Sequence, residues 1–247
     1  MPRRALALLS LILLASVALG ACGNNAKPSI SDPKEIITKA FEAIQKAKTV
    51  HIDATVDGTL NPVLLGLGQA GDIALAGTTL GIDADLANKN LKLTASVPAL
   101  LGMTADIIVI GPDTYTKVSL SGDKYVKSST GATSPTDPAI AIAELKTFLD
   151  RPEVKATKKD DASCGSKSCY TIQVDLDAAA LKALVPGTDL GDATVSLAIL
   201  VEKDTLYPAS FTVTAKGSTI GDLTIKLNLS NWDKAVDVTA PPADQVQ

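Results

Sequence analysis

Histidine, cysteine, aromatic residues and excess basic charge are all scarce in this chain of 247 residues. It has one histidine, three cysteines and only 3% aromatic residues. Because metal sites and Ser/His/Asp or Cys/His groups need those side chains, we expect no metal, no cofactor and no catalytic residue. With 23 basic residues against 27 acidic ones, the net charge of −4 argues against a nucleic-acid partner. The 46% of hydrophobic residues suffices for a buried core and excludes a disordered chain.

The first residues have the pattern of an export signal. Arg3 and Arg4 precede an apolar run at residues 5–19 that is short for a membrane span. The run ends in Leu-Gly-Ala-Cys22, which resembles a bacterial lipobox, where the cysteine thiol receives diacylglycerol. We therefore expect a signal peptide at 1–21, a lipid-anchored Cys22 with a polar tether to residue 31, and an exported protein on the outer side of the cell membrane. An ordinary secretory signal with an incidental cysteine is the alternative.

Export leaves Cys164 and Cys169 as a pair in an oxidising compartment, which favours a disulfide. The intervening Gly-Ser-Lys-Ser suits a hairpin turn between two strands. A redox-active pair would more often be spaced Cys-x-x-Cys, and a metal site would need further ligands.

The body begins with an amphipathic helix and continues as strands. Asp32-Pro33 is a helix start, and apolar residues then recur at helical spacing to about Lys48. From Val50 onward apolar and polar residues alternate, which predicts antiparallel strands with one wet face. The expected strands lie near residues 50–57, 72–75, 82–86, 91–97, 105–110, 114–118, 124–127, 154–159, 170–176, 194–202, 209–216 and 221–229, with further helices at 137–149 and 177–185.

About ten strands and three helices predict an α+β fold. Strands of eight to ten residues, roughly 26 to 33 Å long, form a twisted sheet that curls into a half-barrel with helices on its concave face. We expect one domain at 32–238 and a frayed tail at 239–247.

Many inward-facing positions carry small residues, which suggests unfilled apolar volume that could hold an apolar ligand; helices that fill this space completely are the alternative. The small inward residues are Ala54, Ala74, Ala84, Ala95, Ala198 and Ala215. The cavity candidates are Ile37, Phe41, Ile44, Ile52, Ala54, Val56, Ile82, Ala84, Leu91, Leu93, Phe148, Leu223, Ile225 and Leu227.

Two apolar loops are candidates for a gate over such a cavity. They lie at residues 61–68 and 98–103, and ordinary core at the end of the sheet is the alternative. Their apolar residues are Leu64, Leu65, Leu67, Leu100, Leu101 and Met103.

For His51, two pairs of acidic residues and Trp232 we expect a structural or solubilising role, not a catalytic or metal-binding one. His51 has no second nitrogen or thiol to form a metal site with it. The acid pairs Asp83 with Asp85 and Asp160 with Asp161 are expected on wet faces as solubilising charge, and Trp232 is expected to pack the chain end against a helix.

Three stretches carry a resemblance to a known family. They are Thr-Val-His-Ile at 49–52, Asp-Lys-Tyr-Val-Lys at 123–127 and Leu-Ser-Asn-Trp-Asp-Lys-Ala-Val-Asp-Val-Thr-Ala-Pro-Pro at 229–242. With the lipobox, they make the chain similar to the mycobacterial LppX/LprG-type lipoproteins, whose fold resembles the LolA/LolB carriers. The resemblance implies a half-barrel whose cavity holds acylated lipids or glycolipids for transfer across the envelope, in some members beside an export pump. The cysteine pair and the few aromatic residues depart from the mycobacterial pattern.

The leading hypothesis is a membrane-anchored, non-enzymatic lipid carrier of the cell envelope. A structural or assembly lipoprotein that binds another envelope protein is the first alternative. An esterase is the second, but no Gly-x-Ser-x-Gly motif occurs in the sequence.

Overall fold

The first described element is the amphipathic helix α2 (Pro33–Lys46). The structure, a computed structural model, describes residues 29–61, 72–129, 138–184 and 191–247. The Asp32 carboxylate accepts a hydrogen bond from the Lys34 backbone N–H at 2.9 Å, and Pro33 occupies the first turn, as the sequence predicts. Ile36, Phe41 and Ile44 are among the buried residues of its apolar face.

An antiparallel sheet of twelve strands forms the body of the described chain. Its strands are β1 (Thr49–Leu60), β2 (Ile73–Ala74), β3 (Thr78–Asp85), β4 (Asn90–Val97), β5 (Met103–Ile110), β6 (Asp113–Val118), β7 (Val126–Ser129), β8 (Ala156–Cys164), β9 (Lys167–Leu176), β10 (Thr194–Glu202), β11 (Pro208–Gly217) and β12 (Gly221–Ser230). The order across the sheet is β7-β6-β5-β4-β3-β1-β12-β11-β10-β9-β8, with the short β2 paired to β1.

The first and last long strands meet in the middle of the sheet. β1 and β12 pair over eight positions, so one meander, β3 to β7, lies on one side and a second, β8 to β12, on the other. Two glycines permit the close approach at one end of this pair. A Cβ at Gly58 would lie 1.9 Å from the Asp222 carbonyl oxygen, and one at Gly221 would lie 2.5 Å from that of Thr59.

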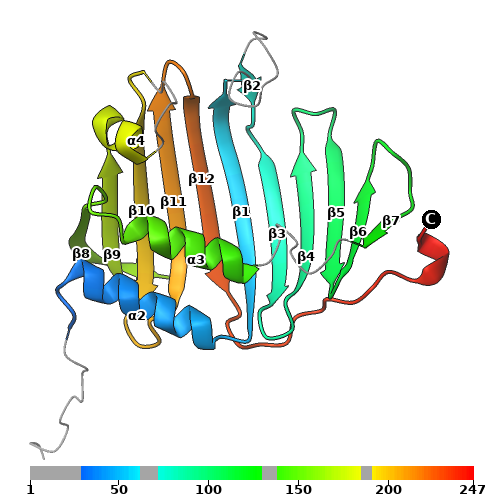
Figure 1. Ribbon diagram of the computed structural model, residues 1–247, viewed down its shortest axis with the longest axis horizontal. Coiled ribbons are helices and arrows are strands. Elements are labelled where there is room, and N and C mark those ends of the chain that lie inside the picture. The colour runs from blue at the N-terminus through cyan, green and yellow to red at the C-terminus, as the bar shows by residue number, and fades with distance from the viewer. Residues whose placement is uncertain (1–28, 62–71, 130–137, 185–190) are drawn as a thin grey trace, which may run out of the picture.

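The helices pack on one face of the sheet. α2 and α3 (Pro138–Leu149) cross that face side by side, over the half that contains β9 to β12, and the short α4 (Ala178–Leu184) lies near the other end of the strands (Figure 1). The larger core cluster lies between the helices and this half, with Ile36, Ile172 and Val201 fully buried. The expected α+β half-barrel is confirmed: the sheet is curved and open, with helices on its inner face.

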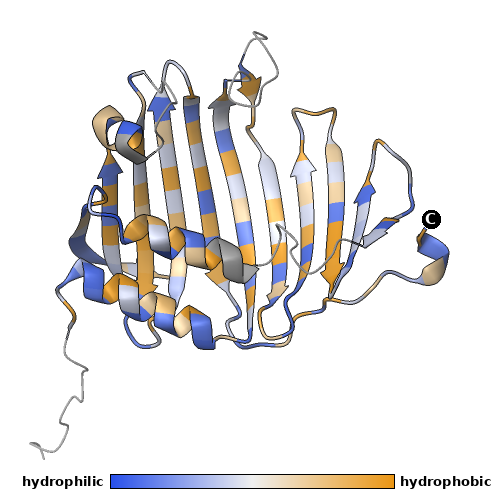
Figure 2. Cartoon of the chain, in the orientation of Figure 1, coloured by the Kyte–Doolittle hydropathy of each residue, from blue (hydrophilic) through white to orange (hydrophobic). Residues whose placement is uncertain are grey.

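Hydrophobic and hydrophilic residues alternate along several of the strands (Figure 2). In β1, Ile52 and Ala54 face inward, and their sheet neighbours Ile82, Leu227 and Leu229 do the same. His51, Asp53 and Asp83 occupy the outward positions. The alternation predicted from the sequence is therefore the actual division between the two faces.

The frayed tail is the clearest error of the sequence-based prediction. After β12 the chain runs past the ends of the neighbouring strands towards β7, as the red segment of Figure 1 shows. It ends near the short helix η2 (Ala243–Gln245). The Tyr125 backbone N–H donates to the Gln245 carbonyl at 2.8 Å, and the Gln247 N–H donates to the Tyr125 carbonyl at 2.9 Å. The tail stays ordered because its backbone groups find partners beside β7.

Candidate functional site

An apolar hollow of about 560 Å³ lies between the helices and the inner face of the sheet. We call it the inner hollow. All nineteen residues that line it have apolar side chains: Phe41, Ile44, Val50, Ile52, Ile82, Ala84, Leu86, Leu91, Ile142, Leu145, Phe148, Leu176, Val195, Leu197, Phe211, Val213, Leu227, Leu229 and Trp232. A space with such a lining offers no polar partner to water, and it is suited to an apolar ligand.

The phenylalanines and the tryptophan of the chain gather here, whereas its four tyrosines are not in the lining. All three phenylalanines and the single tryptophan line the inner hollow. Phe41 comes from α2, Phe148 from α3, Phe211 from β11, and Trp232 from the segment after β12. These rings surround the hollow without filling it, so the expectation of unfilled volume agrees with the structure.

Eight of the fourteen cavity candidates lie in the lining of the inner hollow. These are Phe41, Ile44, Ile52, Ile82, Ala84, Leu91, Phe148 and Leu227. They come from both long helices and from β1, β3, β4 and β12, so segments far apart in the chain meet at one place.

Six candidates lie elsewhere. Ile37 is buried in the main core under α2, and Ala54 is buried in the middle of the sheet. Val56, Leu93, Leu223 and Ile225 are half-buried in the strands. The reason is length: β1 and β12 have 12 and 10 residues, roughly 40 and 33 Å, and thus extend beyond the width of two helices. Among the small residues expected to point inward, Ala74 is exposed and Ala198 faces the outer side, so the prediction is wrong for both.

The gate candidates that the structure describes, Leu100, Leu101 and Met103, are not in the lining of the inner hollow. Leu100 and Leu101 are 45% and 92% exposed at the turn between β4 and β5, and Met103 begins β5. Leu91, which lines the hollow, is at the opposite end of β4, about 20 Å away. Leu64, Leu65, Leu67 and the lipobox Cys22 lie outside the described residues.

Trp232 fixes the segment after β12 at the edge of the inner hollow. Its ring stacks on Tyr207 with centroids 4.6 Å apart, and its Nε1–H donates to the Pro208 carbonyl at 3.1 Å. The Tyr207 hydroxyl donates to Asp233 at 2.6 Å, which raises the pKa of Tyr207 to about 12 and lowers that of Asp233. The Trp232 ring thus packs on the turn between β10 and β11 as well as on both core clusters. The sequence analysis had named only a helix as its packing partner.

Sequence reasoning missed several residues of the lining. Ile142 and Leu145 precede Phe148 at intervals of three on α3, and Phe211 and Val213 alternate with threonines on β11. The other lining residues not named in advance are Val50, Leu86, Leu176, Val195, Leu197, Leu229 and Trp232. The scarcity of aromatic residues was a usable signal, since every phenylalanine of the chain lies here.

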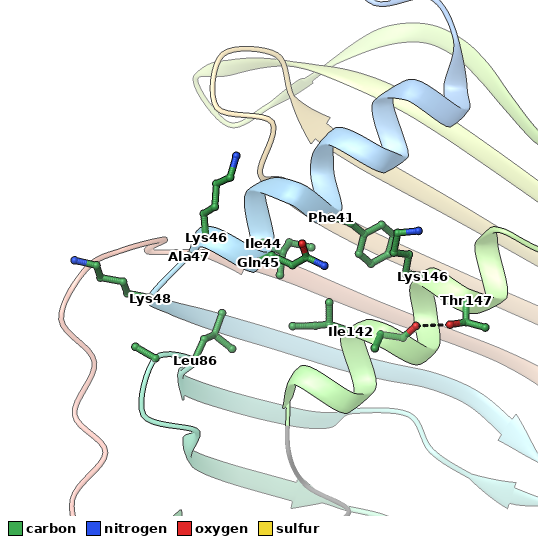
Figure 3. A pocket seen from close by; sticks show the side chains of 12 residues that line it. Phe41, Ile44, Gln45, Lys46, Ala47, Lys48, Leu86, Ile142, Lys146 and Thr147 are labelled. Atoms are coloured by element: carbon green, nitrogen blue, oxygen red, sulfur yellow. Dashed lines mark hydrogen bonds between the residues drawn. The ribbon is translucent and has the colours of Figure 1, made fainter.

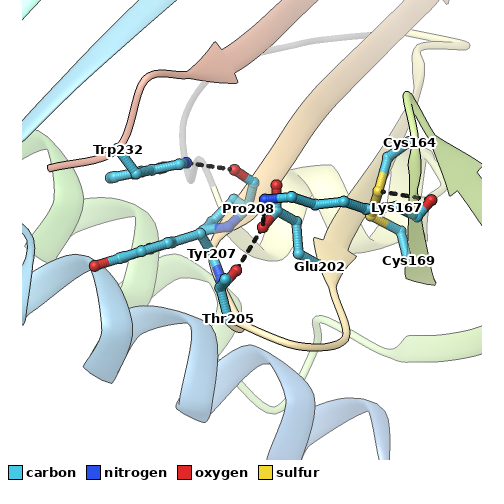
Figure 4. The surroundings of a disulfide bond; sticks show 8 residues. All are labelled: Cys164, Lys167, Cys169, Glu202, Thr205, Tyr207, Pro208 and Trp232. Carbon is cyan, nitrogen blue, oxygen red and sulfur yellow. Dashed lines mark hydrogen bonds and ion pairs between the residues drawn. A yellow bond between two sulfur atoms is a disulfide. The ribbon is translucent and has the colours of Figure 1, made fainter. Parts of the chain in front are cut away.

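A second, polar groove of about 820 Å³ lies on the outer face, which we call the outer groove. Ser210 and Lys226 line it, and their chain neighbours Phe211 and Leu227 line the inner hollow on the opposite face. At its border is the Cys164–Cys169 disulfide, which confirms the expected pairing across the hairpin of β8 and β9. Beside it, Lys167 forms an ion pair of 2.6 Å with the buried Glu202 (Figure 4).

His51 and Asp161 form hydrogen bonds or ion pairs with neighbouring side chains. His51 Nδ1 lies 2.7 Å from Asp83, and this hydrogen bond is the main cause of a raised His51 pKa. Asp161 forms ion pairs with Lys158 and Lys203, which lower its pKa. In the part of the chain that the structure describes, no three His, Cys, Asp or Glu side chains gather as a metal site would require. The described helices include none long and apolar enough to cross a membrane.

Of three comparisons with known proteins, only the comparison with solved structures gives matches. Neither models of protein families nor the curated proteins give a match. Among solved structures, the lipoprotein LppX of Mycobacterium tuberculosis aligns with 85% of this chain and 100% of its own, at 18% identity and a TM-score of 0.53. LprF from Mycobacterium bovis aligns with 86% of this chain and 99% of its own, at 18% identity and a TM-score of 0.54. The chain therefore has the fold of the mycobacterial lipoproteins LppX and LprF.

Proposed function

We propose that the protein is a membrane-anchored lipoprotein that binds an acylated lipid or glycolipid in the inner hollow and carries it within or across the cell envelope. The observation that carries the proposal is the hollow itself, whose nineteen lining residues are all apolar. A packed core would close such a space, because interiors of proteins rarely contain voids larger than a water molecule.

The size of the inner hollow fits an acyl chain. An engineered cavity of about 150 Å³ holds a six-carbon benzene ring, so a space of about 560 Å³ has room for on the order of twenty carbons. Burial of each methylene contributes about 0.8 kcal/mol, and a chain of about sixteen carbons therefore offers on the order of 12 kcal/mol before ordering costs. The apolar lining thus supplies enough free energy without a polar anchor.

The rest of the proposal concerns location and release. The lipobox pattern at Cys22 supplies the anchor, and residues 22–31 supply a short tether that keeps the hollow near the membrane surface. Since a tightly held acyl chain leaves slowly, a carrier needs a part that opens, and an export pump is the partner that the resemblance suggests. We assign no catalytic residue.

Native mass spectrometry of residues 22–247 carrying Cys22→Ser tests the proposal. The sheet and the helices against it lie within residues 29–247, so this chain contains the whole described fold. We expect a co-purified acylated species, or uptake of one palmitoyl lipid after lipid challenge. A chain that is free of lipid, and stays so after the challenge, would overturn the proposal in favour of a structural or assembly lipoprotein.

A matched pair of variants locates the ligand. Ala84→Phe places a ring in the inner hollow, whereas Ala198→Phe makes the same change on the outer face. We expect lipid occupancy to fall at least tenfold in Ala84→Phe and to persist in Ala198→Phe, with circular dichroism showing that both fold. Equal occupancy in the two variants would place the lipid elsewhere. If the protein hydrolysed the lipid, and if His51→Ala abolished that hydrolysis, the protein would instead be an esterase.

A further inference from the structure

A second pocket adjoins the inner hollow at the end of α2. It has a volume of about 590 Å³ and shares Phe41, Ile44, Leu86 and Ile142 with the lining of the hollow. Its remaining walls come from the last turn of α2, the segment into β1, the turn after β3 and one face of α3 (Figure 3). The two spaces are therefore neighbours on the same face of the sheet.

The second pocket is lined by cations. Lys46 and Lys48 come from the end of α2 and the segment after it, and Lys146 comes from α3, so we call it the lysine pocket. Its twelve lining residues include no Asp or Glu, although the whole chain has a net charge of −4. Gln45 and Thr147 add polar groups to the same walls. An apolar hollow that adjoins a pocket with three lysines in its lining is complementary to an amphiphile with a negative head.

Two carboxylates lie near these lysines, and the charge of Lys48 is one of the causes that lower the pKa of Asp233. Lys146 forms an ion pair with Asp150 on its own helix. Asp233 accepts hydrogen bonds from the Lys48 backbone N–H at 2.8 Å and from the Tyr207 hydroxyl. Lys46 lies in the last turn of α2, where a cation also complements the helix end. The side chains of Lys46 and Lys48 are exposed and extend outward, away from the other lining side chains (Figure 3), so their ammonium groups lie at the rim and not inside the pocket.

From this juxtaposition we propose that the lysine pocket binds the anionic head group of the acylated ligand, an oxyanion such as a lipid phosphate. This inference rests on the proposed function and narrows its ligand class to anionic amphiphiles. The acyl chain supplies the affinity in the hollow, and the lysines supply the preference for charge and fix the orientation of the ligand.

The test compares lipids that share one palmitoyl chain. Residues 22–247 with Cys22→Ser are titrated with lysophosphatidylglycerol, which is anionic, and with lysophosphatidylcholine, which is zwitterionic, below their micellar concentrations. Because exposed ion pairs are weak, we expect a preference for the anionic lipid of about three- to tenfold that declines with added salt. Lys46→Gln combined with Lys48→Gln removes this preference, and it weakens binding of the zwitterionic lipid less than that of the anionic lipid because choline offsets the phosphate charge.

The control carries Lys34→Gln and Lys155→Gln, which change the net charge equally at exposed sites outside the lysine pocket. We expect it to retain the preference. Equal affinity of the wild-type chain for both lipids, or a preference that survives Lys46→Gln and Lys48→Gln, would overturn the head-group proposal and leave lipid binding intact. Failure of both lipids to bind would overturn the proposed function as well. Inorganic phosphate that binds as tightly as the anionic lipid would show a free-phosphate site and would also overturn the proposal.

Discussion

At the scale of single residues, His51 is the side chain whose role the sequence left most open. It lies on the outer face of β1, 29% exposed, with Asp83 2.7 Å from Nδ1 and Asp53 3.3 Å from Nε2. Asp53 lies two residues further along β1, whereas Asp83 lies on β3 and is brought opposite His51 only by the strand register. The histidine therefore has acidic partners on the outer face, and the sequence analysis did not identify this ion pair.

The His51–Asp83 pair predicts a pH dependence of stability. The folded state raises the pKa of His51 above 6.5, so its contribution is fully present below pH 6.5 and is lost as pH rises through the raised value. We expect the free energy of unfolding to fall as the pH rises from 6.5 through the raised pKa of His51, and to fall less in Asp83→Asn. Urea unfolding at several pH values measures this, and an identical pH dependence in both proteins would contradict it.

At the scale of elements, the hairpin of β8 and β9 and the segment after β12 show what a sequence can and cannot specify. The hairpin is local: Cys164 and Cys169 are five positions apart in the sequence, and their Cα atoms lie 5.9 Å apart. The sequence therefore predicts both the turn and the disulfide. The pairing of Tyr125 with Val246 is non-local, and no pattern within residues 239–247 indicates which strand edge they join.

Removal of the disulfide should weaken the protein modestly. In the chain-entropy model, a loop this small contributes about 2 kcal/mol, and the large core cluster does not depend on it. We expect Cys164→Ser with Cys169→Ser to lower the free energy of unfolding by about 2 kcal/mol while the circular dichroism spectrum is retained. Guanidinium unfolding of both proteins gives the difference, and loss of folding would show that the hairpin has a larger role.

At the scale of the whole molecule, the alternating pattern predicts the sheet, its two faces and the half-barrel. It identifies Ile52, Ile82 and Leu227 at the inner hollow because alternation fixes the face of a residue. It does not fix how far along a strand the helices extend, so it includes Val56 and Ile225, which lie beyond the hollow. That limit depends on where α2 and α3 cross the sheet, which is a property of tertiary packing.

The inner hollow also contains a natural probe. Trp232 is the only tryptophan of the chain and lines the hollow, so its fluorescence reports on the occupant without any label on the protein. A bromine atom quenches indole fluorescence only near contact. Quenching of Trp232 by a brominated acyl chain therefore shows that the chain lies next to this residue. Because Trp232 also borders the outer groove, Ala84→Phe serves as the variant with an occluded hollow.

Titration with brominated palmitate, with unbrominated palmitate as the control, is the most direct test that the inner hollow holds an acyl chain. We predict saturable quenching of Trp232 by the brominated chain alone, at a stoichiometry of about one, and loss of this quenching in Ala84→Phe. Fluorescence that the brominated chain leaves unchanged, or quenching that is equal in Ala84→Phe, would contradict the account.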